Sequence, residues 1–291
     1  MDAGEPCPQP VHRGYHWRIW GAEAAGTSLL VLGALSAVAF VLGENSPVAQ
    51  IVSSTSVRLL LAGLLVGATV ALIAVSPLGR LSGSHLNPAV TLALGVLGRV
   101  GARDVCGYLL AQFAGALLGA LAFHLLWGGI ALSVGGGVTH PSVARPVALA
   151  VEAGMTGLLV ATILFFLSRQ RLARWTPLVV WMLLAVLIWR FSRYTGTSLN
   201  PARSEGPAVA FGDFSDLWIY LVAPIAGALA VATAWRRTRP SMHPKTAKLF
   251  HDARYPCAFS SEIPAMGPDA AIVGSGIGAR RARAALARTG R

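Results

Sequence analysis

The chain carries one motif twice, in SGSHLNPAV at residues 82–90 and in TSLNPARS at residues 197–204. Each copy places Asn directly before Pro at the head of an apolar run too short for a bilayer, which takes about twenty residues to cross. Asparagine is a strong helix N-cap, and proline is favoured at the first helical position because its missing N–H has no partner there. The motif therefore predicts two half-helices, from Pro88 to about Leu97 and from Pro201 to about Phe211.

The composition is that of an integral membrane protein. Of the 291 residues, 54% are hydrophobic and 12% are charged, and the mean hydropathy is +0.60, which is not typical of a soluble domain. The net charge of +12 gathers largely in the tails and short loops, so we interpret it as a signal of membrane orientation and expect no nucleic-acid partner. The three cysteines have no paired spacing, and we expect neither a metal site nor a cofactor.

Six further apolar runs are long enough to span a membrane. EAAGT at residues 23–27 has a counterpart in EAGMT at residues 152–156, so the chain divides into two similar halves. Because each half has three spans, the second must enter the membrane inverted, and the two half-helices meet at the midplane. We therefore predict an all-α membrane protein with six transmembrane helices plus two re-entrant half-helices in an inverted repeat. The expected spans cover residues 19–42, 58–75, 105–127, 146–167, about 175–189 and 217–235, with a glycine-rich loop at 128–144.

The sequence predicts a channel domain between two tails. The N-terminal tail covers residues 1–16, and the channel domain covers residues 17–235, with repeats at about 17–127 and 146–235. The C-terminal tail, residues 236–291, is basic and rich in Pro, Gly and Ala, and we expect it to be largely disordered.

Charges in the short loops predict the orientation. The N-terminal segment, the loops at 99–103 and 169–174 and the exit at 236–239 are basic and fall on one side, which the positive-inside rule makes cytoplasmic. We therefore expect both termini in the cytoplasm. Four arginines disagree with this orientation, and most of them are interpreted as snorkelling from the outer helix ends: Arg58, Arg145, Arg190 and Arg193.

The half-helix starts carry the expected chemistry of a pore. If the two elements abut, Asn87 and Asn200 can use their side-chain oxygens as caps and turn their amide N–H groups toward the lumen. Both helix dipoles then present positive ends to the centre, which sets an electrostatic barrier against cations, the proton included. We predict a narrow centre that offers two hydrogen-bond donors to a passing solute oxygen.

The two motifs, with an arginine directly after the second, resemble the aquaporin (major intrinsic protein) family over residues 17–235. The resemblance implies an hourglass fold in membrane lipid, passive flux of water or small uncharged solutes, and a homotetramer in the plasma (inner) membrane. The motif residues that it places in the pore are Asn87, Pro88, Ala89, Asn200, Pro201 and Ala202.

The same resemblance implies an outer constriction. It is lined by Gly67, or by Val66 if the preceding loop differs by one residue, together with Ile188, Thr197 and Arg203. A charge at membrane depth is costly and is by default a functional candidate; the alternative for Arg203 is an ordinary snorkelling arginine.

Three more residues receive roles from the resemblance. Glu23 and Glu152 are intramembrane carboxylates that would hold loop backbone amides behind the pore, with a proton relay as the alternative. His85 is expected near the cytoplasmic vestibule, where its role is solute contact or packing.

The expected constriction departs from that of water-selective members, which have an aromatic residue and a histidine where this chain has Gly67 and Ile188. A wider opening with one apolar wall suits glycerol, urea or metalloid hydroxides such as boric or arsenious acid. Ser204 and Ala208 resemble water channels instead. The combination is most similar to nodulin-type channels and bacterial aquaglyceroporin-like members.

The sequence therefore predicts a passive channel and not an enzyme. Two alternatives stay open: a coupled transporter that uses Glu23 and Glu152, and a non-conducting membrane scaffold on the same fold.

Overall fold

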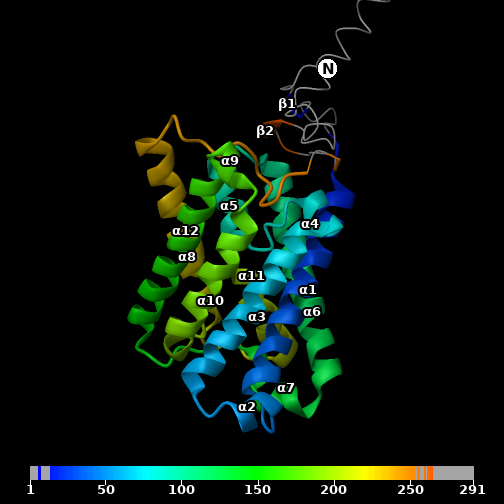
Figure 1. Cartoon of the computed structure of the whole chain (residues 1–291), viewed down its shortest axis with the longest axis vertical. Helices are drawn as coiled ribbons and strands as arrows, with labels where there is room; N and C mark the ends of the chain where they lie inside the picture. Colours follow the sequence, from blue (N-terminus) through cyan, green and yellow to red (C-terminus); the bar gives the residue numbers. More distant parts are fainter. Residues whose placement is uncertain (1–5, 8–13, 253, 256–258, 260, 265–291) are drawn as a thin grey trace, which may run out of the picture.

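The computed structural model describes residues 6–7, 14–252, 254–255, 259 and 261–264. Within these residues, six helices are long and apolar enough to cross a membrane (Figure 1), which confirms the all-α fold with six spans. They are α1 (Trp17–Leu42), α3 (Thr55–Val75), α6 (Ala102–Trp127), α8 (Arg145–Leu167), α10 (Thr176–Thr195) and α12 (Leu217–Thr238).

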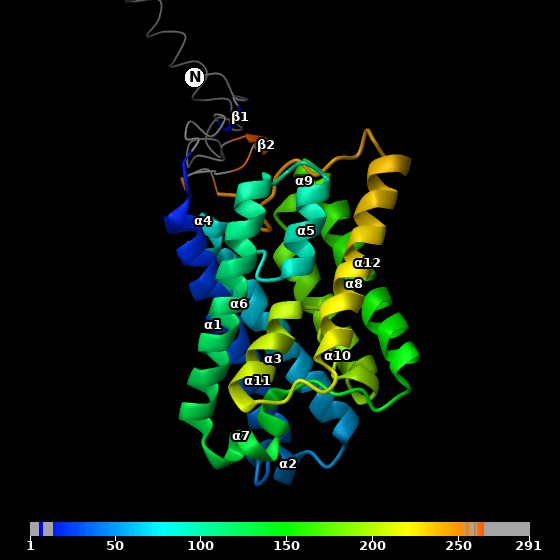
Figure 2. The ribbon, with the colours of Figure 1, turned by 180° about the vertical axis from the view of Figure 1, so that it is seen from behind.

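The half-helices are α5 (Pro88–Val96) and α11 (Pro201–Phe211), and each begins at the predicted proline. Figure 2 shows them one above the other between the long helices. The short elements are α2 (Pro47–Ile51), α4 (Pro77–Ser82), α7 (Gly129–Ser133), η1 (Gly135–Gly137) and α9 (Gln170–Ala173), with strands β1 (Pro6–Cys7) and β2 (Ser261–Pro264) paired antiparallel.

One predicted boundary is wrong, because α10 continues six residues beyond Trp189 to Thr195. The arginines that follow Trp189 do not break the helix. It ends at Gly196, which is left-handed with φ of 76° and donates its N–H to the Ser192 carbonyl, an arrangement that glycine adopts without steric penalty.

Small residues let the helices of each half approach closely. In the first half a Cβ on Gly115 of α6 would strike the carbonyl of Ala24 in α1, and in the second half a Cβ on Gly227 of α12 would strike the carbonyl of Ala153 in α8. Both contacts involve the residue directly after an intramembrane glutamate, so the two halves use the same packing. Close approach of this kind drives helix association in lipid.

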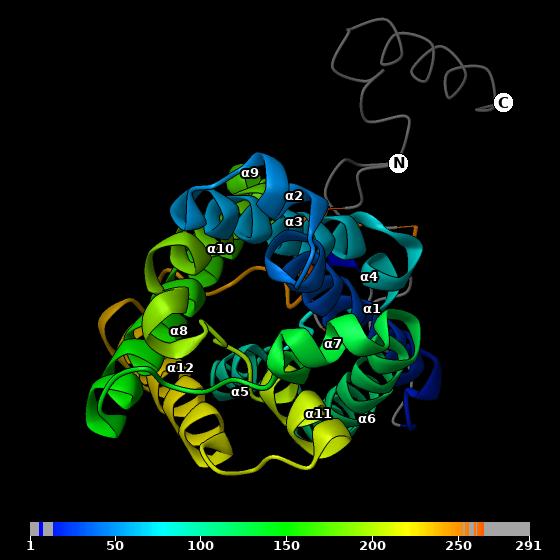
Figure 3. The same ribbon diagram turned by 90° about the horizontal axis from the view of Figure 1, so that it is seen from below.

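The bundle has two ends, which we name by the short helices that they carry. The α9 end holds α4, α9 and the C-terminal end of α12, and the α2 end holds α2 and α7 (Figures 1 and 2). Viewed from the α2 end, the long helices form an incomplete ring, and the half-helices α5 and α11 lie between α12 and α6, where they close it (Figure 3).

Residues 239–252, which we call the strap, correct the prediction of a disordered tail from residue 236. Helix α12 extends to Thr238, and the strap then folds back across the α9 end, where Ala247 is fully buried and Leu249 is 3% exposed. Lys248 Nζ donates to the Arg80 carbonyl at 2.7 Å. The predictions for the N-terminal tail at 1–5 and 8–13, and for the C-terminal tail at 265–291, lie outside the described residues.

Candidate functional site

The two motif asparagines brace each other's loops at the centre of the bundle. Asn87 Oδ1 accepts from the Ala89 N–H at 2.9 Å, and its Nδ2 donates to the Leu199 carbonyl at 2.9 Å. Asn200 Oδ1 accepts from the Ala202 N–H at 3.1 Å, and its Nδ2 donates to the Leu86 carbonyl at 2.7 Å. Because a side-chain amide has two N–H donors, each asparagine keeps one donor beyond this bond, and both asparagines line the central cavity.

The loops before the asparagines share an unusual backbone. Ser84 and Leu86 in the first loop, and Thr197 and Leu199 in the second, have φ between 53° and 55°. They are the third and first residues before each asparagine. The left-handed conformation costs about 1–2 kcal/mol for a residue with a Cβ, so the surrounding contacts must hold it. Neither the crossed bonds nor this backbone was predicted from the sequence.

Glu152 is one of those contacts in the second half. It is fully buried, and its Oε1 accepts from the Ser198 N–H at 3.0 Å and from Thr195 Oγ1 at 2.7 Å. Its Oε2 accepts from the Leu199 N–H at 2.9 Å. Both oxygens are thus occupied by the loop that leads to Asn200.

Glu23 holds the first loop in a similar way. It is fully buried, and its Oε1 accepts from the Leu86 N–H at 2.5 Å and from Gln112 Nε2 at 2.9 Å. Gln112 Nε2 also donates to Thr91 Oγ1 of α5 at 3.0 Å. Each glutamate thus accepts a backbone N–H of the loop before a motif asparagine, and Glu23 does so through one oxygen only.

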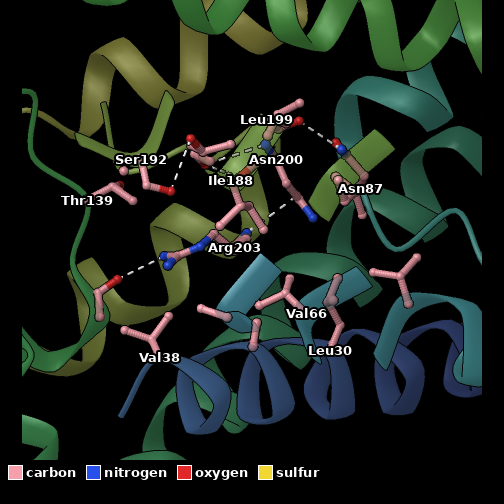
Figure 4. A pocket seen from close by; sticks show the side chains of 18 of the residues that line it. Leu30, Val38, Val66, Asn87, Thr139, Ile188, Ser192, Leu199, Asn200 and Arg203 are labelled. Atoms are coloured by element: carbon pink, nitrogen blue, oxygen red, sulfur yellow. Dashed lines mark hydrogen bonds between the residues drawn. The ribbon is translucent and has the colours of Figure 1, made fainter. Parts of the chain in front are cut away.

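A cavity of about 540 Å³ passes the asparagines, and three of the predicted constriction residues line it: Ile188, Thr197 and Arg203. The fourth is a correction, because Val66 and not Gly67 lines the cavity (Figure 4). Gly67 faces α10, where an added Cβ would lie 2.6 Å from Trp181 Cδ1. The alternative alignment, shifted by one residue, therefore fits the structure.

Arg203 follows Asn200 on α11 and contacts the glycine-rich loop, which packs against the same helix. Its Nη1 donates to the Gly137 carbonyl at 2.8 Å (Figure 4). Gly137 has φ of 75°, and a Cβ there would strike the Leu35 side chain of α1, so only glycine fits. The sequence showed the glycine-rich loop but gave no reason to connect it to Arg203.

The α2 end of the cavity has a charged rim. His140 lines the cavity and lies 3.1 Å from Asp213 and 3.5 Å from Asp216, which also pairs with Arg145 at 3.0 Å. Hydrogen bonds from Ser215 lower the pKa of Asp213 below its ordinary value. His140 carries no local signal in the sequence, because its acidic partners are more than seventy residues away.

At the α9 end, His85 lines the cavity and also contacts the strap. Its Nδ1 lies 3.1 Å from Thr91 Oγ1, and its Nε2 lies 2.8 Å from the Ala247 carbonyl. His85 lines the cavity together with Leu249 of the strap.

The fold and the site define a multi-pass integral membrane channel built from two similar halves. Residues 11–235 match the family described as Major intrinsic protein. The chain belongs to the major intrinsic protein family, whose members are channels and not enzymes, and this confirms the resemblance found in the sequence.

Relatives include a protein named glycerol uptake facilitator protein-like 6 from Lactiplantibacillus plantarum, 38% identical over 53% of this chain and 74% of that protein. The probable aquaporin NIP7-1 of Arabidopsis thaliana is 31% identical over 78% of this chain and 80% of that protein. The X-ray structure of the aquaglyceroporin from Plasmodium falciparum matches with a TM-score of 0.64 and 24% identity, over 78% of this chain and 99% of that one, which shows a shared fold.

Proposed function

We propose that this chain forms a passive pore for water and small uncharged solutes of the glycerol, urea or metalloid-hydroxide class, and that it excludes protons and other ions. The observation that carries the proposal is the crossed pair of asparagines beside a cavity that Arg203 also lines. Two amide donors with both half-helix N-termini behind them favour a neutral oxygen and oppose a cation. The name of one relative, glycerol uptake facilitator protein-like 6, supports glycerol as a solute, and the name aquaporin of another supports water.

The constriction in this proposal consists of Val66, Ile188, Thr197 and Arg203. Val66 makes the opening narrower than the glycine first expected, but leaves it wider than an aromatic side chain would. Val66 and Ile188 supply apolar contact, while Thr197 and Arg203 supply polar contact. Such a lining suits a solute with hydroxyl groups along one edge and less polar surface on the other.

Glu23 and Glu152 serve in the proposal as loop supports. Their contacts favour this role over a proton relay, because Glu152 has both oxygens bonded to the loop before Asn200 and Glu23 accepts from the Leu86 amide. The α9 end would face the cytoplasm, as the basic short loops indicate. Membership of the family supports a homotetramer in the plasma (inner) membrane.

A narrowed constriction tests the solute class. In proteoliposomes, stopped-flow light scattering is expected to show re-swelling under glycerol, urea or boric acid gradients, and the Val66→Phe, Ile188→His double variant is expected to lose most of it while water flux continues. The reason is that an aromatic ring and an imidazole reduce the opening and remove the apolar wall. Ile188→Val is the matched control and should keep solute flux. Equal solute flux in the double variant and the parent would mean that the constriction lies elsewhere.

Solute flux through a passive pore should also be independent of a proton gradient. We expect glycerol flux to be the same with and without a pH step of either sign across the liposome membrane, since the intramembrane glutamates are bonded to backbone amides. The measurement is stopped-flow re-swelling with and without a protonophore. Flux that follows the gradient would instead support a coupled transporter.

A further inference from the structure

The strap crosses the α9 end of the cavity from one half of the molecule to the other. The Lys245 N–H donates to the Leu167 carbonyl at the end of α8, at 2.8 Å. Four residues later, the Leu249 N–H donates to the carbonyl of Gly83, in the loop that leads to Asn87, at 2.9 Å. Viewed from the α2 end, this orange segment lies inside the ring of helices (Figure 3). The strap therefore bridges the two repeats where a solute would leave the cavity.

The buried part of the strap contributes to the cavity wall itself. Leu249 is 3% exposed and lines the same cavity as the two motif asparagines. The Ala247 carbonyl lies 2.8 Å from His85 Nε2, another lining residue. An apolar side chain and an occupied imidazole thus stand at the α9 end of the path.

The rim contacts that hold the strap are ion pairs near solvent. Asp252 pairs with Arg80 at 2.9 Å and with Arg254 at 2.7 Å, and the hydrogen bond from Arg254 is the main reason why the pKa of Asp252 falls to about 2. Such pairs remain formed at neutral pH, and the exposed Arg254 side chain leaves its pair open to screening by salt.

A second anchor lies at Glu262 of β2. It pairs with Arg99 at 2.8 Å, with His243 at 3.0 Å and with Lys245 at 3.5 Å. Burial raises the pKa of Glu262, but the bonds from Arg99 and His243 outweigh it and bring the pKa to about 2. Between α12 and this anchor, residues 239–252 form neither helix nor strand. A segment held by few backbone bonds can open without unfolding the bundle.

We propose that strap residues 245–252 form an intramolecular plug that closes the α9 end of the pore, and that conduction requires this plug to leave its site between Gly83, His85 and Leu167. The proposal rests on the proposed channel function and adds its regulation. In the plugged state the Leu249 side chain blocks the path, and the Ala247 carbonyl stays within hydrogen-bond distance of His85 Nε2. Release frees the imidazole and opens the end of the cavity.

The test compares variants of the full-length chain. Ala247→Glu places a carboxylate where the side chain is fully buried, so the strap must leave its site to keep the charge hydrated. Ser241→Glu, at an exposed position of the same strap, is the matched control. Leu249→Ala removes the side chain that lines the cavity but keeps the backbone bond to Gly83.

Two readouts separate movement from conduction. Trypsin cleavage after Lys248, followed by mass spectrometry on the detergent-solubilised protein, reports release of the strap, because this lysine is 1% exposed. Stopped-flow water and glycerol flux in liposomes reports conduction. For Ala247→Glu we expect faster cleavage and about tenfold higher flux, the change for a plug that occupies about nine channels in ten. Ser241→Glu should match the parent in both cleavage rate and flux. Leu249→Ala should raise the flux and leave the cleavage rate unchanged.

The outcomes distinguish the two proposals. Faster cleavage with parental flux in Ala247→Glu would overturn the plug and leave the channel intact. If Ala247→Glu aggregates on size exclusion or is cleaved no faster than the parent, Leu249→Ala decides, and parental flux in that variant overturns the plug. If the parent and every variant conduct no more than empty liposomes, the channel function itself fails, and the plug fails with it.

Discussion

Glu152→Ala is expected to lower the thermal stability of the protein more than any other single change in the site. The buried carboxylate accepts three hydrogen bonds, from Thr195 Oγ1 at 2.7 Å, from the Ser198 N–H at 3.0 Å and from the Leu199 N–H at 2.9 Å. Alanine leaves both backbone donors buried without a partner, at about 1–3 kcal/mol each. The loss also frees Leu199 from a left-handed conformation that it adopts only under constraint.

The melting temperature reports this effect. For a chain of this size, a loss of several kcal/mol in the free energy of unfolding lowers the melting temperature by on the order of 10 °C. The shift can be measured in detergent by tryptophan fluorescence and by size exclusion. Glu205→Gln is the matched control, because Glu205 lies half-buried on α11 with no partner for its Oε2, and it should melt near the parent. A Glu152→Ala protein with parental melting would show that the loop holds its shape without the carboxylate.

Local signals were enough to predict the spans and the half-helix starts. Apolar length marks a span, and the Asn-Pro pair marks a helix start through contacts within three residues, as the bond from the Ala89 N–H to Asn87 Oδ1 shows. The end of α10 was misplaced because Arg190 and Arg193 look like the edge of a membrane. The helix continues until Gly196, its first breaker.

The constriction could not be fixed from the sequence to single-residue accuracy. An alignment without gaps across α3 and α4 carries an uncertainty of one residue, and one residue turns a helical side chain by about 100°. That turn separates Val66, which lines the cavity, from Gly67, which packs on Trp181. Only the three-dimensional packing of α3 on α10 distinguishes the two.

Contacts between segments that lie far apart in the chain could not be predicted from the sequence either. The bond from Arg203 to the Gly137 carbonyl joins residues 66 positions apart, and the contact of His85 with Ala247 joins residues 162 positions apart. Neither has a periodic pattern in the sequence. The strap also lacks the apolar periodicity of a helix, and composition alone favours disorder there, although its backbone is bonded to Leu167 and Gly83, which belong to separate repeats.

Arg203→Ala is expected to open the pore to protons and to raise glycerol flux. The guanidinium lines the cavity and is held there by the Gly137 carbonyl, so its removal both widens the constriction and removes a fixed positive charge. Charges in a confined space of low dielectric act strongly on a passing cation. The measurement is the decay of a pH step, followed with a pH-sensitive dye inside proteoliposomes, beside stopped-flow glycerol flux. Arg190→Ala, at an exposed arginine of α10, is the control and should leave both unchanged.

Arg203→Lys separates charge from geometry. Lysine keeps the positive charge but is a compact ammonium on a flexible stem, without the planar fork that fixes the guanidinium. If charge forms the barrier, Arg203→Lys should exclude protons like the parent, while its less ordered side chain lets glycerol pass faster. If the proton permeability of Arg203→Ala equals that of the parent, the barrier is formed instead by the half-helix N-termini at Asn87 and Asn200. A change at residue 203 does not remove the dipoles of these helices.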